Sequence, residues 1–160
     1  MYTFGPLNKQ PLYMQLIDFV KTNELLSVLS GQLSASLNRH LNRKFRTAGL
    51  AITTEQWLVL MCLWNKDGQT QQSLSDQTSK DKTSITRLLD TLSKNRLVER
   101  HSDPADRRIN KIHLTDKGRE MENHAMKIVK ESFDQAVSGI SSKELIDAKE
   151  VIVKLLNNII

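Results

Sequence analysis

The sequence of 160 residues has one cysteine, few aromatic side chains and no long apolar run. Because Cys62 stands alone, no internal disulfide can form, which fits a reducing cytoplasm. A membrane-spanning helix needs about 18 consecutive apolar residues, and none occur. The opening residues, MYTFGPLNKQ, lack the basic and apolar segments of a secretory signal. We therefore expect a cytoplasmic chain without a membrane partner, folded as one domain or as one domain with an extension.

Motifs for catalysis, metal binding and phosphate binding are also missing. The sequence has no Gly-rich phosphate loop, no His-Glu-x-x-His helix and no Ser or Cys set beside a base in a recognisable catalytic motif. Its histidines lack the helical spacing of metal ligands; they are His40, His101, His113 and His124. Cys62 has no basic neighbour in sequence, so we interpret it as a small apolar filler rather than a redox centre. We expect neither an enzyme nor a resident metal or cofactor.

The basic residues, by contrast, gather in one quarter of the chain. Residues 80–119 hold eleven Lys and Arg against six Asp and Glu, while the other 120 residues hold twelve of each. The whole net charge of +5 therefore falls in this window. A localised basic surface is typical of a protein that binds a nucleic-acid backbone, although a solvated basic face without a partner gives the same pattern.

Apolar spacing and capping residues predict a mainly α fold with a small β-wing. A long amphipathic helix is expected over 23–46, followed by three shorter helices. A hairpin of two strands (97–101 and 111–114) comes next, and two more helices end the chain. The predicted N-cap residues are Thr53, Thr70, Asp81, Thr115 and Ser141. We divide the chain into an arm and helix (1–52), a winged helix-turn-helix (53–115) and C-terminal helices (116–160). A small helical bundle with an incidental hairpin is the alternative.

The helix that begins after Asp81 has two different sides. Its apolar side consists of Ile85, Leu88, Leu89 and Leu92. The candidate DNA contacts lie on or beside the opposite side near its start: Lys82, Thr83, Ser84, Thr86 and Arg87. Hydroxyl groups can donate to phosphates or base edges, and an arginine can pair with guanine through two hydrogen bonds. An ordinary surface helix with solvated polar residues is the alternative.

Two adjacent arginines lie near the tip of the predicted hairpin, in the segment DPADRRIN. A long cation such as Arg107 or Arg108, held away from the core, can enter a narrow A·T-rich minor groove. Asp106 can fix the direction of a neighbouring arginine by a bidentate pair. The alternative is a surface salt bridge within a turn, which would contribute less than about 1 kcal/mol.

The run from Leu74 to Gly118 resembles the multiple antibiotic resistance regulator (MarR) family of bacterial transcription factors. The matching segments are SLSDQTSKDKTSITRLLDTLSKNRLVER, DPADRR and HLTDKGRE. The flanking helices extend the likeness to about residues 23–160. In two places the sequence departs from the family: Asn95 stands where Gly is frequent before the first wing strand, and the arm before residue 20 is not a general feature.

The resemblance implies a winged helix-turn-helix flanked by long dimerisation helices, acting on double-stranded DNA, usually as a repressor. Arg108 would enter the minor groove, Asp106 would orient it, and Arg107 would reach a phosphate or support the wing. Apolar stripes on the first and last helices, and the ending LLNNII, independently favour a homodimer. A two-fold dimer predicts a pseudo-palindromic operator.

The family also implies a small-molecule effector in a cleft between the dimer helices and the DNA-binding lobe. His40, Trp57 and Met61 are the candidates to line such a cleft, although Trp57 and Met61 are equally compatible with a plain core role. A winged helix can instead serve as a protein–protein module. That alternative predicts an apolar or acidic outer face on the helix after Asp81, where the sequence places Thr83, Thr86 and Arg87.

Overall fold

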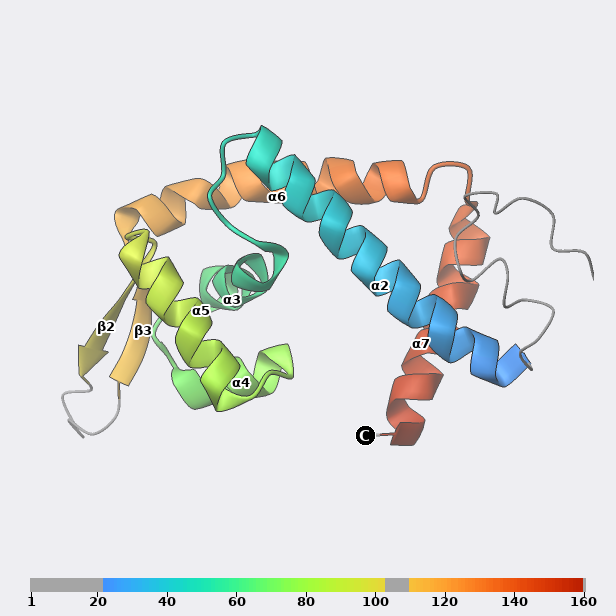
Figure 1. The fold of residues 1–160 in the computed structure, drawn as a ribbon, viewed down its shortest axis with the longest axis horizontal. Coiled ribbons are helices and arrows are strands. Elements are labelled where there is room, and N and C mark those ends of the chain that lie inside the picture. Colours follow the sequence, from blue (N-terminus) through green and yellow to red (C-terminus); the bar gives the residue numbers. More distant parts are fainter. Residues whose placement is uncertain (1–21, 103–109, 160) are drawn as a thin grey trace, which may run out of the picture.

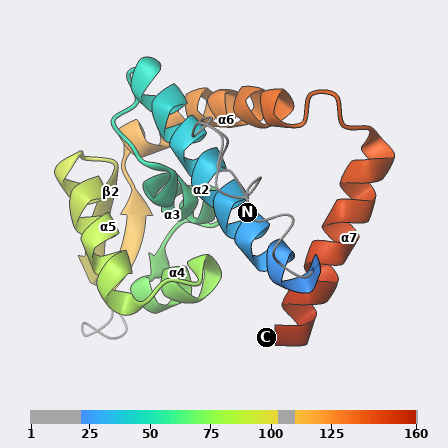
Figure 2. The same cartoon turned by 45° about the vertical axis from the view of Figure 1, so that its right-hand side comes forward.

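The computed structural model describes residues 22–102 and 110–159, which form a mainly helical chain with a small sheet (Figure 1). The elements in chain order are α2 (Thr22–Thr47), α3 (Thr54–Asn65), β1 (Gln69–Thr70), α4 (Gln71–Thr78), α5 (Lys82–Lys94), β2 (Val98–Ser102), β3 (Asn110–Leu114), α6 (Asp116–Ala136) and α7 (Ser142–Ile159). The winged unit, α3 to β3, occupies one end, and α2, α6 and α7 extend away from it (Figure 2). This arrangement confirms the predicted fold class.

The helices begin where the sequence places their capping residues. The hydroxyl of Thr53 accepts from the backbone N–H of Gln56, and the Gln56 side chain accepts from the backbone of Thr53, which completes the predicted capping box. At four further predicted N-cap positions, Thr70, Asp81, Thr115 and Ser141, the side chain likewise accepts from the backbone N–H three residues later. Each cap satisfies backbone donors that the first helical turn leaves without partners.

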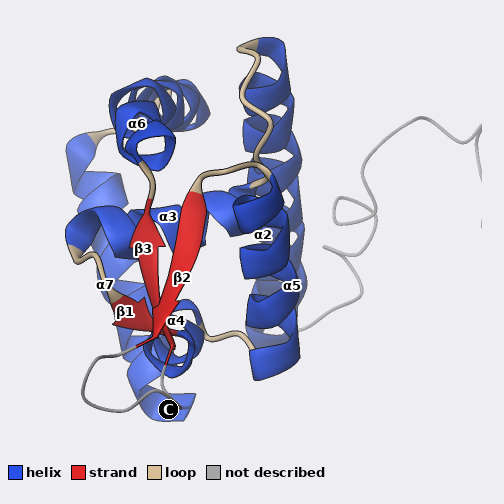
Figure 3. Cartoon of the chain, turned by 90° about the vertical axis from the view of Figure 1, so that its left-hand side faces the viewer, coloured by secondary structure: helices blue, strands red, loops and turns tan. Residues whose placement is uncertain are grey.

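The sheet has three strands rather than the two that the sequence predicts. β3 is central and pairs antiparallel with β2 on one side and with the short β1 on the other, in the order β1-β3-β2 (Figure 3). In β1, Gln69 is paired with Ile112 and Thr70 with Lys111. The prediction missed β1 because two polar residues carry no alternating pattern, and only the distant β3 makes them a strand.

The core lies between the C-terminal half of α2, the winged unit and the first part of α6. Its largest fully buried side chains are Phe45, Val59, Leu60, Leu63, Leu74, Ile85, Leu89, Leu92, Leu97 and Ile112. In α7, by contrast, the described side chains are all exposed. α7 follows α6 through a turn and passes beside the N-terminal half of α2, where Ile152 lines a cavity with Leu26 and Leu29 (Figure 2).

The segment Leu-Thr-x-x-Gly joins the sheet to α6 through two close contacts. The hydroxyl of Thr115 accepts from the backbone N–H of Gly118, and the backbone N–H of Thr115 donates to the carbonyl of Leu97. A Cβ atom on Gly118 would lie 2.1 Å from that same carbonyl oxygen. The start of α6 therefore reaches the start of the wing only because residue 118 has no side chain.

The connection between α5 and β2 shows why Asn95 can stand where glycine is frequent in the family. Asn95 has ordinary helical backbone angles (φ −79°), so it does not need the conformational freedom of glycine. The left-handed conformation falls on the next residue, Arg96, with φ +58°. The Asn95 amide instead donates to the backbone carbonyl of Ala51, which lies in the loop that precedes α3.

Replacing Gly118 with Ala tests the close approach of α6 to the wing. The added methyl group would overlap the Leu97 carbonyl, so we expect the free energy of unfolding to fall by about 1–3 kcal/mol in urea denaturation. Gly31→Ala in α2 is the matched control, because its Cβ would meet open space and Ala favours helix by up to about 1 kcal/mol. Equal stability of Gly118→Ala and the wild type would contradict this account.

Candidate nucleic-acid interface

One side of α5 is buried and the other faces outward, as the sequence predicts. Ile85, Leu89 and Leu92 are at most 1% exposed. Thr83, Arg87 and Lys94 lie on the opposite side of the helix and are exposed. The burial therefore fixes the rotation of α5 and presents two long cations and a hydroxyl group to solvent.

The five predicted contact residues of α5 fall into two groups. The hydroxyl of Ser84 donates to the Asp81 carboxylate, and that of Thr86 donates to the carbonyl of Lys82. Both side chains thus hold the start of α5 rather than project from it. Lys82, Thr83 and Arg87 are exposed, and within the described residues Thr83 and Arg87 make no side-chain hydrogen bond. The sequence does not separate these two groups, because it does not reveal which hydroxyl groups the helix start itself uses.

Gln71 on α4 is a positioning residue that the sequence did not reveal. Its side-chain amide donates both to the Thr86 hydroxyl and to the carbonyl of Lys82, which ties the first turn of α4 to the first turn of α5. An amide that bridges two helix starts carries no signal in sequence, since its partners lie 11 and 15 residues away. The bridge holds the start of α5 at a fixed position relative to α4.

The tight turn between α4 and α5 is held at several points. Ser79 closes α4 in the left-handed conformation with φ +51°. The backbone N–H of Lys80 donates to the carbonyl of Ser75, and the Ser75 hydroxyl donates back to the carbonyl of Lys80. The Lys80 ammonium also pairs with the Glu55 carboxylate on α3. These contacts make the turn a fixed part of the helix-turn-helix.

The wing is anchored to α5 along its base. Arg100 on β2 donates to the Asp90 carboxylate on α5 at 2.7 Å. The predicted wing-tip residues Asp106, Arg107 and Arg108 lie outside the described residues.

A carboxylate, Asp67, joins the end of α3 to β3 and α6. One of its oxygens accepts from the backbone N–H of Leu114 at 2.9 Å, and the other accepts from the Arg119 guanidinium at 2.7 Å. Partial burial by itself raises the pKa of Asp67, but the hydrogen bonds from Leu114, Arg119, Gly68 and His113 outweigh it and hold the pKa below its ordinary value. The charged form of Asp67 is therefore the one that fits the base of the wing.

Cys62 is a core residue, and the described side chains form no metal site. Cys62 is buried in the core, and this burial raises the pKa of its thiol, which lowers its reactivity. In residues 22–102 and 110–159, no three His, Cys, Asp or Glu side chains come together as a metal site. No helix in the same part of the chain has both the length and the apolar character that crossing a membrane requires.

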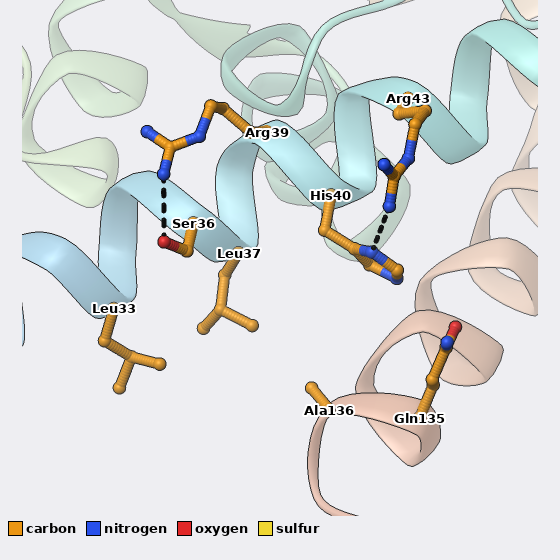
Figure 4. A pocket seen from close by; sticks show the side chains of 8 residues that line it. All are labelled: Leu33, Ser36, Leu37, Arg39, His40, Arg43, Gln135 and Ala136. Carbon is orange, nitrogen blue, oxygen red and sulfur yellow. Dashed lines mark hydrogen bonds between the residues drawn. The ribbon is translucent and has the colours of Figure 1, made fainter. Parts of the chain in front are cut away.

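The three predicted effector-pocket residues do not share one cavity. His40 lines a cavity of about 560 Å³ between α2 and the end of α6, with Arg39, Arg43 and Gln135 (Figure 4). Trp57 lines a second cavity of about 400 Å³. Leu33 and Leu37 of α2 line both cavities and separate one from the other. Met61 is 38% exposed and lines neither of them.

The His40 cavity contains an unsatisfied donor. Arg43 approaches Nδ1 of His40 at 3.2 Å, and because arginine can only donate, Nδ1 is the acceptor and the proton sits on Nε2. This Nε2–H is buried and has no partner among the described residues. Together with the guanidinium groups of Arg39 and Arg43, it gives the cavity a donor-rich, cationic wall.

Comparison with known proteins decides the family. Residues 52–109 match the MarR family. The HTH-type transcriptional regulator MhqR of Bacillus subtilis is 30% identical over 125 residues, which are 78% of this chain and 84% of that protein. The chain belongs to the MarR family. A MarR transcriptional regulator from Methanosarcina mazei Go1 has 26% identity and a TM-score of 0.75, over 86% of this chain and 99% of the other.

A further structural neighbour, reduced AbfR bound to DNA, has a TM-score of 0.73 and 23% identity over 86% of this chain and 91% of the other, a likeness of fold alone. The MarR family membership confirms the resemblance seen in the sequence and the expectation that the chain is a regulator rather than an enzyme.

Paired Thr→Val substitutions test the division of the contact residues. Thr86→Val removes the hydroxyl that bonds to Gln71 and Lys82, so we expect the free energy of unfolding to fall by about 1 kcal/mol. Thr83→Val replaces an exposed hydroxyl and should change the free energy of unfolding by less than about 0.5 kcal/mol. Chemical denaturation of both variants gives the comparison, and a larger loss at Thr83 than at Thr86 would contradict the assignment.

Proposed function

We propose that this MarR-family protein is a cytoplasmic transcriptional regulator that reads a specific, pseudo-palindromic DNA operator as a homodimer, most simply as a repressor. The observation that carries this proposal is the outward face of α5, where Thr83 and Arg87 are exposed beside the anchored wing. The basic excess of the whole chain lies in residues 80–119, which build α5, the wing and the start of α6. Together they match a helix that enters the major groove and a hairpin that flanks it.

Each element has a separate chemical task in this proposal. Arg87 on α5 pairs with the O6 and N7 atoms of a guanine, and Thr83 contacts a neighbouring base edge or phosphate. Arg108 enters the adjacent minor groove, Asp106 orients it, and Arg107 reaches a phosphate or supports the wing. The wing assignments rest on the sequence and the family resemblance.

The exposed apolar surface supports a homodimer built from α2, α6 and α7. The large apolar side chains exposed on α7 are Leu145, Ile146, Val151, Ile152, Val153, Leu155, Leu156 and Ile159. Leu26 and Leu33 on α2 and Phe133 on α6 are exposed as well. An apolar surface of this extent is typical of an interface with a partner chain. A two-fold dimer would present two copies of α5 to successive turns of the duplex.

The His40 cavity supports regulation by a small amphipathic acid. A carboxylate can accept from Arg39 or Arg43, while Leu33 and Leu37 contact an apolar body. The Nε2–H of His40 is buried, and it becomes a further donor to the ligand when the ring turns toward the cavity. The ligand would release the operator if it binds better to a dimer whose recognition helices are misplaced for DNA.

A winged-helix module that binds a protein without reading DNA is the other candidate. That function needs an apolar or acidic outer face on α5, whereas Thr83, Arg87 and Lys94 are exposed there. The chemistry of this face therefore favours DNA.

DNA binding is tested with the purified protein, its own upstream intergenic duplex and a scrambled duplex. We expect the wild type to prefer the real sequence, and Arg87→Ala to weaken operator binding by about 1–3 kcal/mol while affecting random DNA much less. Arg108→Ala should also weaken binding and reduce the preference at an A·T flank. Equal losses on both duplexes would show that these arginines contact phosphates only.

The effector proposal is tested by calorimetry with a panel of aromatic acids, followed by operator release. We expect binding heat with the wild type, its loss in Arg43→Ala, and its retention in Trp57→Phe, which alters the other cavity. A panel that gives no heat and releases no operator would contradict the assignment.

A further inference from the structure

A shallow groove separates the second half of α5 from the wing strand β2. It has a volume of about 400 Å³ and is lined by Asp90, Ser93, Lys94 and Arg100. We propose that this groove seats the DNA phosphate backbone that runs between the major and the minor groove, with Lys94, Arg100 and Ser93 as the phosphate contacts. The inference rests on the proposed function, since it requires that α5 and the wing enter adjacent grooves.

The topology of DNA leads to this site. One sugar–phosphate strand lies between any major groove and the minor groove next to it. If α5 occupies the first and the β2–β3 hairpin the second, that strand has to pass between α5 and β2. Figure 3 shows α5 and the hairpin as neighbouring elements with β2 on the side toward α5. The residues that line the groove come from these two elements.

The sheet register directs the cation of β2 into this groove. Arg100 is paired with Ile112 and lies on the same face of the hairpin as Val98, the face that turns toward α5 and the core. Glu99 and His101 lie on the other face, where the carboxylate and the imidazole pair at 2.9 Å. Arg100 therefore lies on the side of β2 where a DNA phosphate backbone between α5 and the wing would pass.

The donors in the groove are arranged for an anion. Asp90 binds one nitrogen of the Arg100 guanidinium at 2.7 Å, which holds the group against α5 while its other N–H donors stay available. Lys94 lies on the outward face of α5, two turns after Arg87, and is exposed. In the described part of the chain, neither the Ser93 hydroxyl nor the Lys94 ammonium has a hydrogen-bond partner. Arg100 neutralises Asp90, so the charge of Lys94 makes the groove positive overall.

Lys94→Gln tests this inference, with Lys127→Gln on α6 as a control that removes the same charge outside the groove. Binding of the full-length protein to its operator and to a random duplex is measured over a salt series. Because the proposed homodimer carries two copies of Lys94, the variant loses two phosphate contacts, which should reduce the slope of log K against log salt by about 1.8 and weaken binding to both duplexes by the same factor. The operator preference should stay that of the wild type, because a phosphate contact carries no sequence information.

Arg100→Gln should lower the slope at least as much, because it removes a cation from the groove and also leaves the Asp90 carboxylate there without its partner. The inference is overturned if Lys94→Gln and Arg100→Gln keep the wild-type slope, or if Lys127→Gln lowers it as much as they do. A change in operator preference at Lys94→Gln would also overturn it, since that result assigns Lys94 to base contact. Failure of the proposed function itself looks different: the wild-type protein would then show no preference for any operator.

Discussion

The burial of one side of α5 is the constraint on which the whole interface depends. Ile85, Leu89 and Leu92 pack against the core that α3, α4 and the sheet provide, and each contributes about 1.5–3 kcal/mol when it leaves water. A rotation of α5 would expose all three side chains at once. Thr83 and Arg87 therefore face outward because the apolar side chains on the opposite side of α5 are buried. Their own interactions do not determine this orientation.

The remaining contacts keep this helix and the wing in one rigid unit. Gln71 fixes the start of α5 to α4, the Asp90–Arg100 pair joins its second half to β2, and Asp67 joins the base of β3 to α6. Gly118 lets α6 approach the first wing strand closely. A movement of α6 would thus carry α5 and the wing with it, which is how a ligand bound between α2 and α6 could act on a distant DNA contact.

Local signals in the sequence were sufficient for the helices, because a capping residue such as Thr53 or Asp81 acts within three residues of itself. Contacts between distant segments were not visible in the same way. β1 exists only because β3 lies beside it, and the pairing of Thr86 with Gln71 depends on the angle between two helices. The cavity residues were also misjudged as one group, since His40 and Trp57 both lie near α2 but on different flanks of it.

The central claim is that a two-fold dimer reads DNA with a helix and a wing from each protomer. Hydroxyl-radical footprinting on duplexes that the protein selects from a random pool tests it directly. The account predicts two protected half-sites related by two-fold symmetry, with centres one helical turn (about 10 bp) or a multiple of it apart. Selected duplexes that share no sequence, or a single asymmetric protected site, would contradict it.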